Sequence, residues 1–127
     1  MIDFDKIWVE KYRPAKLDDI ILDKRTLKIV KEFKNEIPNL LFVGNPGTGK
    51  TTLARVIVND ILGCNYLYIN ASDESGIDTI RHNITNFAQT KSFDGNVKVV
   101  ILDEADGLTS QAQAALRNTM ETYAKYC

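Results

Sequence analysis

The chain has 127 residues, a formal net charge of −1, and 44% hydrophobic and 26% charged residues, which suits one ordinary globular domain. This balance excludes a strongly basic nucleic-acid-binding chain, and no apolar run approaches the roughly 20 residues of a membrane span. The N-terminus lacks the basic-then-apolar pattern of a secretory signal, so we expect a protein that is not secreted and has no membrane partner.

The first predicted elements flank a glycine-rich turn. Apolar spacing predicts an amphipathic helix over Thr26 to Phe33. The run Leu40–Val43 is short, apolar and followed by Gly44, and it predicts a buried strand. Beyond the turn, apolar residues recur at helical spacing, and Gly63 is expected to end this helix. The residues with this spacing are Leu53, Ala54, Val56, Ile57, Ile61 and Leu62.

Two further pairs of strand and helix follow. Tyr66–Ile69 predicts a strand, and the spacing from Ile77 to Phe87 predicts a helix. After a turn at residues 92–96, the β-branched run Val97–Leu102 predicts a third strand. A last helix over residues 112–123 is expected to be capped by Thr109 or Ser110. Strand and helix repeated three times indicate an α/β domain with a parallel sheet.

Residues 44–51 match the complete phosphate-binding pattern G-x-x-x-x-G-K-[ST]. Glycines tolerate positive φ and let the backbone approach phosphate, so that successive N–H groups and the start of the next helix point at its oxygens. Lys50 can reach the β- and γ-phosphates, and the hydroxyl of Thr51 can ligate Mg²⁺. A glycine-rich turn that binds nothing is the alternative, but a chance match in so short a chain is on the order of one percent.

Two acids, Asp103 and Glu104, directly follow the apolar run of the third predicted strand. Next to a triphosphate, Asp103 would hold Mg²⁺, and Glu104 would orient and polarise the attacking water. A solvated strand end is the alternative interpretation. The tetrad that begins at Asp103 also occurs in one class of helicases, but it fits ATPases of the AAA+ group equally.

Four segments together resemble the small subunits of replication factor C. They are the N-terminal box Trp8–Pro14, the strand and loop of residues 70–78, the third strand and tetrad of residues 98–106, and the helix of residues 112–121. The phosphate loop marks a very large superfamily, whereas the first and last of these segments are much narrower signals. The resemblance implies an AAA+ P-loop NTPase fold, a three-layer core with a parallel sheet, truncated after the third strand and the helix that follows it.

The resemblance also implies an activity. Such subunits assemble into a ring, bind ATP and Mg²⁺, and place a sliding clamp on primer-template DNA during replication. The implied partners are therefore other clamp-loader subunits, the clamp and DNA, and the implied location is the cytoplasm, or the nucleus of a eukaryote. Another AAA+ ATPase, such as a helicase loader or branch-migration motor, and a catalytically weak nucleotide-binding module remain as alternatives.

The same resemblance assigns further contacts residue by residue. Glu104 and Lys50 would be catalytic, and Thr51 and Asp103 would bind the metal. Arg81, Thr109, Ser110 and Gln111 would face DNA. The expected nucleotide contacts are Val9, Tyr12, Arg13, Pro14, Ile20 and Ile21 around adenine, with Asn45, Pro46, Gly47, Thr48, Gly49, Lys50, Thr51 and Thr52 around the phosphates.

Two departures from the family pattern carry expectations of their own. Ser75 stands where the family usually has a basic residue that couples DNA to the catalytic glutamate, which puts that coupling in doubt. The sequence stops where the family continues into a fourth strand and an arginine that reaches a neighbour's ATP. We therefore expect slow turnover by this chain alone, and unpaired strand edges that either rearrange or associate with another chain. Residues 1–38 are predicted to form the adenine-flanking segment and helix, and residues 39–127 the partial nucleotide-binding core.

Overall fold

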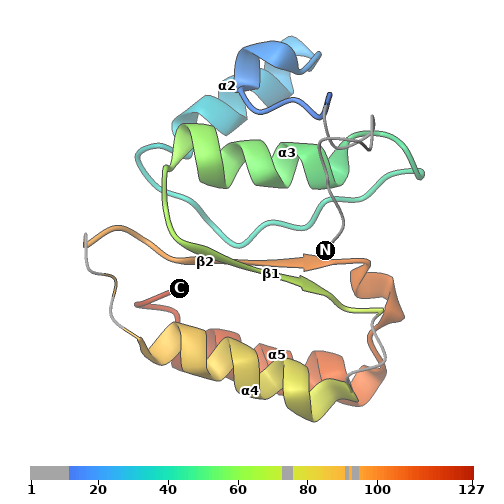
Figure 1. Ribbon diagram of the computed structural model, residues 1–127, viewed down its shortest axis with the longest axis vertical. Helices are drawn as coiled ribbons and strands as arrows, with labels where there is room; N and C mark the ends of the chain where they lie inside the picture. The colour runs from blue at the N-terminus through green and yellow to red at the C-terminus, as the bar shows by residue number, and fades with distance from the viewer. Residues whose placement is uncertain (1–11, 73–75, 91, 93–94) are drawn as a thin grey trace. The chain divides into compact units, whose positions relative to one another are not determined.

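The structure, a computed structural model, describes residues 12–72, 76–90, 92 and 95–127 (Figure 1). The chain forms two compact units, Met1–Gly63 and Cys64–Cys127. The first unit carries the phosphate-loop segment, and the second carries a parallel sheet with two helices. The division predicted from the sequence lies between residues 38 and 39 and stays a prediction.

Helix α2 of the first unit spans Lys24–Glu32 and confirms the predicted amphipathic helix, two residues earlier than its spacing indicated. Asp23 explains the earlier start, because its Oδ1 accepts hydrogen bonds from the backbone N–H groups of Arg25 and Thr26, both at 3.0 Å. These first N–H groups have no partner inside a helix, so the cap satisfies them. Hydrogen bonds from the side chain and backbone of Thr26 lower the pKa of Asp23.

The predicted helix after the phosphate loop is present in two parts. Helix α3 spans Lys50–Val56, and a π-helical turn, η3, continues it over Ile57–Ile61. The backbone N–H of Leu62 donates to the carbonyl of Ile57 at 2.9 Å, which closes the wider turn. Gly63 follows with a φ of +55°, as expected for the residue that ends a helix.

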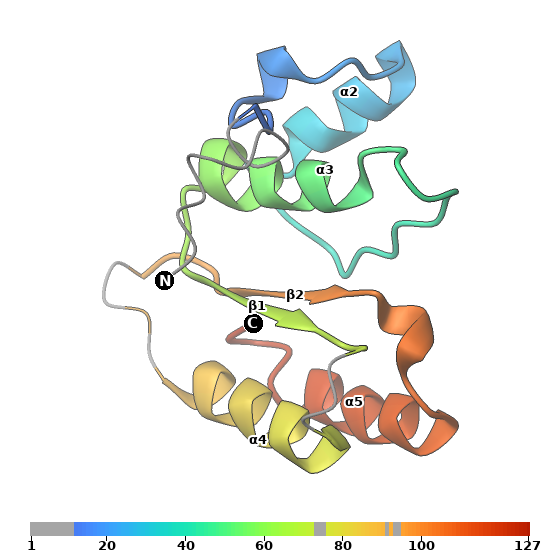
Figure 2. The same ribbon diagram turned by 45° about the vertical axis from the view of Figure 1, so that its right-hand side comes forward.

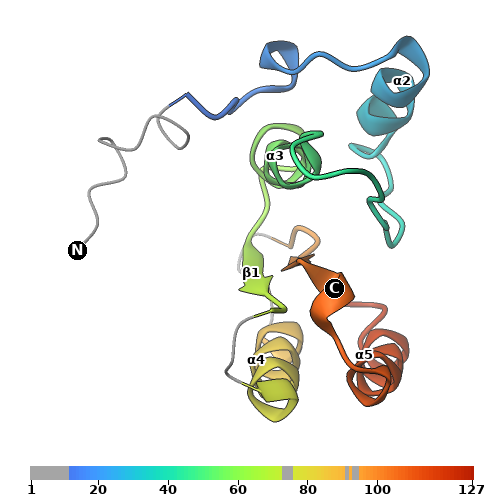
Figure 3. The same ribbon diagram turned by 90° about the vertical axis from the view of Figure 1, so that its right-hand side faces the viewer.

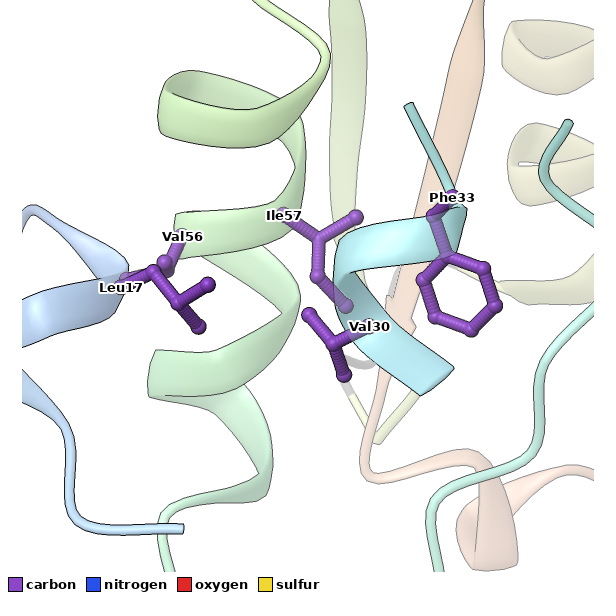
Figure 4. Close-up of a cluster of buried hydrophobic side chains, with 5 residues drawn as sticks. All are labelled: Leu17, Val30, Phe33, Val56 and Ile57. Carbon is purple, nitrogen blue, oxygen red and sulfur yellow. The ribbon is translucent and has the colours of Figure 1, made fainter. Parts of the chain in front are cut away.

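The core of the first unit joins three segments that are distant in sequence. Its buried side chains are Leu17, Val30, Phe33, Val56 and Ile57 (Figure 4). They come from the 3₁₀ turn η2 (Leu17–Asp19), from α2 and its C-cap, and from the α3–η3 helix. The backbone N–H of Leu17 also donates to Asp60 Oδ2 at 2.8 Å. The N-terminal segment is thereby held against the helix that begins at the phosphate loop.

The prediction of a buried strand at Leu40–Val43 is wrong. These residues form no ladder, and the side chains of Leu41 and Val43 are 81% and 85% exposed. Phe42 alone turns inward and packs against the core of the first unit. A strand is held by hydrogen bonds to a neighbouring strand. An apolar run shows that a segment suits burial, but it does not supply that neighbour.

The second unit contains the two other predicted strands, β1 (Tyr66–Asn70) and β2 (Val99–Asp103). They pair in parallel, in a register that runs from Tyr66 opposite Val99 to Asn70 opposite Asp103. Helix α4 spans Gly76–Gln89 and helix α5 spans Ser110–Thr122. Both helices cover the same face of the sheet, side by side (Figures 1 and 2). The predicted α/β class with a parallel sheet is confirmed.

The core of this unit lies between the sheet and the two helices. Ile80 and Ile84 of α4 and Leu116 of α5 are buried. The inward-facing sheet residues Leu67, Ile69, Val100 and Leu102 pack against them. Figure 3 shows the two helices end-on beneath the strands. Ile80, Ile84 and Leu116 therefore agree with the predicted helical spacings, whereas Met120, predicted on the same face of the last helix, is 49% exposed.

Lys98, just before β2, is a buried cation with a structural task. Its side chain is only 4% exposed, and Nζ donates to the carbonyl oxygens of Phe87, Ala88 (3.2 Å) and Thr90. The last carbonyls of a helix have no partner within the helix and carry partial negative charge. Lys98 therefore joins the end of α4 to the start of β2, which begins at Val99 rather than at the predicted Val97.

Candidate functional site

The phosphate loop has the backbone that its glycines predict. Gly47 and Gly49 adopt positive φ values of +78° and +89°, which an L-residue with a side chain rarely takes. Gly49 is the N-cap of α3 and offers no side chain to the first N–H groups of that helix. These groups are the donors that a phosphate accepts at such a loop. The backbone of the loop therefore fits a phosphate ligand.

Lys50 closes the loop onto itself in this structure. Its Nζ donates to the carbonyl oxygens of Gly44 and Asn45, both at 2.8 Å. Thr48 Oγ1 donates to the same Asn45 carbonyl at 2.8 Å, and a Cβ on Gly44 would lie 3.0 Å from that hydroxyl oxygen. Side chains of the loop therefore hydrogen-bond to carbonyl oxygens of the same loop. The exposed ammonium group can exchange these neutral acceptors for charged phosphate oxygens, which bind it more strongly.

The acidic pair stands at the carboxyl end of β2. Asp103 is the last residue of the strand, opposite Asn70, and it is half-buried. Glu104 follows as an exposed residue with a φ of +53°, the left-handed region that residues other than glycine seldom adopt. Such a conformation at a candidate catalytic residue is typical of functional sites. The 3₁₀ turn η4 (Ala105–Gly107) then leads away toward α5.

Tyr68 of the neighbouring strand and Ser72 of the turn after it hydrogen-bond to the two acids. The hydroxyl of Tyr68 donates to Asp103 Oδ2 at 2.5 Å, and the backbone N–H of Glu104 donates to Asp103 Oδ1 at 3.0 Å. Ser72 Oγ lies within hydrogen-bond distance of both Glu104 Oε2 and Asn70 Oδ1. A hydroxyl has one proton, and the charged carboxylate is the stronger acceptor, so we assign the donated bond to Glu104.

The predicted adenine contacts have different surroundings within the first unit. Tyr12 is exposed, whereas Arg13 and Pro14 are half-buried. Ile20 packs against the core, but Ile21 is completely exposed. Val9 lies outside the described residues, as does Ser75, the predicted departure from the family pattern. The described part of this segment is tied to the helix of the phosphate loop through Leu17, so an adenine-flanking role stays a prediction.

The four predicted DNA contacts are all exposed residues of the second unit. Thr109 is the N-cap of α5, and its Oγ1 accepts a hydrogen bond from the backbone N–H of Ala112 at 3.2 Å. Of the two predicted caps, Thr109 and not Ser110 therefore caps this helix. Ser110 and Gln111 follow in the first turn of that helix, and Arg81 lies on α4. Because β1 and β2 are parallel, α4 and α5 both begin beyond the same edge of the sheet, where the acidic pair also lies.

Sequence reasoning identified the acids but missed the residues that hold them. The sequence pattern places Tyr68, Asn70 and Ser72 only in a strand and a loop. Their spacing of two residues was a usable signal, because alternate residues of a strand share a face. Only the register of β1 against β2, which sets Asn70 opposite Asp103, shows that this face meets the acidic pair.

Comparison with known proteins defines the class. The family described as "ATPase family associated with various cellular activities (AAA)" matches residues 40–126, and the chain belongs to it. The more particular resemblance is to proteins named "Replication factor C small subunit". The chain is 53% identical over 125 residues to that of Sulfurisphaera tokodaii, and 48% identical over 129 residues to that of Archaeoglobus fulgidus. The resemblance inferred from the sequence is therefore confirmed.

These alignments include most of the chain and a smaller part of each relative. They cover 92% and 96% of the chain, but only 38% and 40% of the two relatives. A third relative, from Thermofilum pendens, is 50% identical over 95% of the chain and 39% of its own length. The chain thus spans about 40% of the length of the curated relatives it matches. Among the described residues, no helix has the length and apolarity needed to cross a membrane.

Proposed function

We propose that the chain is the nucleotide-binding part of a clamp-loader small subunit, which couples ATP hydrolysis to placing a sliding clamp on primer-template DNA. The observation that carries this proposal is the combination of a phosphate loop with positive-φ glycines and an acidic pair at a strand end, in a chain about half identical to replication factor C small subunits. A replication role would place the protein in the cytoplasm, or in the nucleus of a eukaryote.

The residues fit ATP with Mg²⁺, which would supply charge stabilisation at the transferred phosphoryl group. The loop backbone of residues 45–52 and the Lys50 ammonium would bind the phosphates. Thr51 and Asp103 would hold the metal, in keeping with the preference of Mg²⁺ for a few protein oxygens beside phosphate oxygens. Glu104 would orient the attacking water and accept its proton. Its left-handed backbone and its bond from Ser72 set where that carboxylate lies.

The proposed DNA contacts belong to the same edge of the second unit as the acidic pair. Backbone N–H groups, hydroxyls and an amide at the start of α5, with Arg81 of α4, would contact phosphates. Such contacts position DNA without reading its sequence. The chain's net charge of −1 fits a few local contacts of this kind, with other subunits of the ring supplying more.

Two other functions remain as alternatives to test. Another AAA+ ATPase, such as a helicase loader or branch-migration motor, would share the loop and the acids. A catalytically weak nucleotide-binding module is favoured for this chain by itself, because it spans about 40% of the relatives' length. We propose that the 127-residue chain alone binds ATP but hydrolyses it slowly.

The decisive experiment uses the full-length protein that contains this chain, assembled with its partner subunits. ATP turnover is measured with and without a sliding clamp and primed DNA. A clamp loader is expected to be stimulated only when both are present. Stimulation by neither would favour another AAA+ machine.

The matched variant is Glu104→Gln, which removes the base and keeps the size of the side chain. We expect turnover to fall by about 10² to 10⁴, the usual contribution of a general base, while ATP binding is retained. Turnover that persists in the variant would show that Glu104 is not the base.

A further inference from the structure

Three side chains at alternate positions form a polar row beside the acidic pair. Tyr68 and Asn70 lie on β1, and Ser72 lies in the turn two residues beyond the end of the strand. Alternate residues of an extended strand project to the same side. The row is held in place by the backbone N–H of Ala71, which donates to the carbonyl of Asp103 at 2.8 Å, and by the N–H of Ser72, which donates to Asn70 Oδ1 at 2.9 Å. Both strand ends are therefore fixed to each other.

Asp103 is held by hydrogen bonds at both of its carboxylate oxygens, one of them from Tyr68 of the row. Oδ2 accepts the Tyr68 hydroxyl at 2.5 Å, and Oδ1 accepts the N–H of Glu104 at 3.0 Å. Hydrogen bonds at both oxygens fix the orientation of the carboxylate plane. Each oxygen has two lone pairs, so a carboxylate held in this way can still bind a cation. The Tyr68 bond is half-buried, and a bond to a charged acceptor away from water is strong.

We propose that Tyr68 is a positioning residue for the metal site and acts through Asp103. This inference rests on the proposed function, because it takes Asp103 to be a ligand of the nucleotide-bound Mg²⁺. The Tyr68 hydroxyl sets the orientation of the Asp103 carboxylate before the metal arrives, so the ordering of that side chain does not have to accompany metal binding. Groups that orient metal ligands in this way typically contribute 10- to 100-fold to metal affinity.

The test is Tyr68→Phe in the full-length protein, with Tyr66→Phe as the matched control. Tyr66 lies on the same strand and the same face, but it is opposite Val99 at the far end of the ladder. Each variant loses one phenolic hydroxyl and keeps its ring. Mn²⁺ stands in for Mg²⁺, and its binding in the presence of a non-hydrolysable ATP analogue is measured from the electron paramagnetic resonance signal of free Mn²⁺.

We expect Tyr68→Phe to weaken Mn²⁺ binding about tenfold or more, and Tyr66→Phe to leave it within a factor of two of the wild type. Binding of the analogue without metal should be unchanged in both, which a general loss of structure would not allow. The Mg²⁺ concentration that gives half-maximal ATP turnover should rise in parallel for Tyr68→Phe.

Unchanged or tighter Mn²⁺ binding in Tyr68→Phe would overturn the inference, as would equal weakening in both variants. A wild-type protein that binds the analogue and hydrolyses ATP, but shows no effect of Tyr68→Phe, would refute only the role of Tyr68. A wild-type protein that binds neither the analogue nor Mn²⁺ would refute the proposed function itself.

Discussion

At the scale of single residues, Lys50 shows how the phosphate loop is prepared for a ligand. Its ammonium group bonds to two carbonyls of the loop, Gly44 and Asn45, and these bonds are exposed to solvent. Such exposed bonds contribute little to folding. Phosphate oxygens are charged acceptors and would replace them with stronger bonds. Lys50 should therefore matter for binding much more than for stability.

We expect Lys50→Ala to weaken ATP·Mg²⁺ binding by the 127-residue chain roughly 10- to 100-fold, because a hydrogen bond to a charged group contributes about 1.5–3 kcal/mol. Isothermal titration calorimetry measures this. Lys28→Ala, which removes an exposed lysine from α2 in the same unit, is the control and should bind as the wild type does. Equal binding by wild type and Lys50→Ala would contradict the assigned phosphate contact.

At the scale of elements, the buried cation Lys98 joins a helix to a strand of the second unit. Lys98 lies where β2 begins and satisfies carbonyl oxygens at the end of α4. If an apolar side chain replaced Lys98, these carbonyl oxygens would lose their hydrogen-bond donor. The sheet and α4 would then lose the polar contact that joins them, in addition to the apolar core built around Ile80 and Ile84.

We expect Lys98→Met, which keeps much of the side-chain volume, to lower the free energy of unfolding by roughly 1–3 kcal/mol, the cost of leaving a buried acceptor unsatisfied. Urea denaturation followed by circular dichroism measures the change. Lys125→Met removes an exposed lysine from the turn after α5 and should change stability little. A Lys98→Met protein as stable as that control would show that water satisfies the carbonyls equally well.

At the scale of the whole molecule, Leu40–Val43 is an exposed apolar segment. Leu41 and Val43 are almost fully exposed, and the segment forms no ladder within the described part of the chain. Extended apolar backbone with unpaired N–H and C=O groups tends to pair with another chain. The prediction from the sequence, that unpaired edges rearrange or associate, stays a prediction.

We expect the 127-residue chain to self-associate in the micromolar to millimolar range, and Leu41→Lys to reduce this association. Sedimentation velocity over a concentration series measures both. Ile21→Lys is the control, because Ile21 is fully exposed but lies outside the segment. A wild-type chain that stays monomeric at every concentration would contradict the prediction, and equal effects of both variants would assign the association to general hydrophobicity.

The sequence by itself determined the features whose information is local. The phosphate loop needs glycines at defined positions of one turn, and Gly47 and Gly49 adopt the positive φ that this requires. Helices α2, α4 and α5 formed where the apolar spacing predicted them, because an apolar stripe along one side of a helix can pack against any apolar core. Strands β1 and β2 also formed where their apolar runs predicted them, and Asp103 and Glu104 lie at the end of β2 as predicted.

Only the tertiary structure decided what depends on a partner distant in the sequence. Leu40–Val43 is as apolar as β2, yet it is not a strand, because ladder hydrogen bonds come from a neighbour that no apolar pattern supplies. The parallel register sets Tyr68 beside Asp103 and Ser72 beside Glu104, contacts that link residues more than 30 positions apart. Side-chain chemistry can be read along the chain, but which side chains meet is decided by how the elements pack.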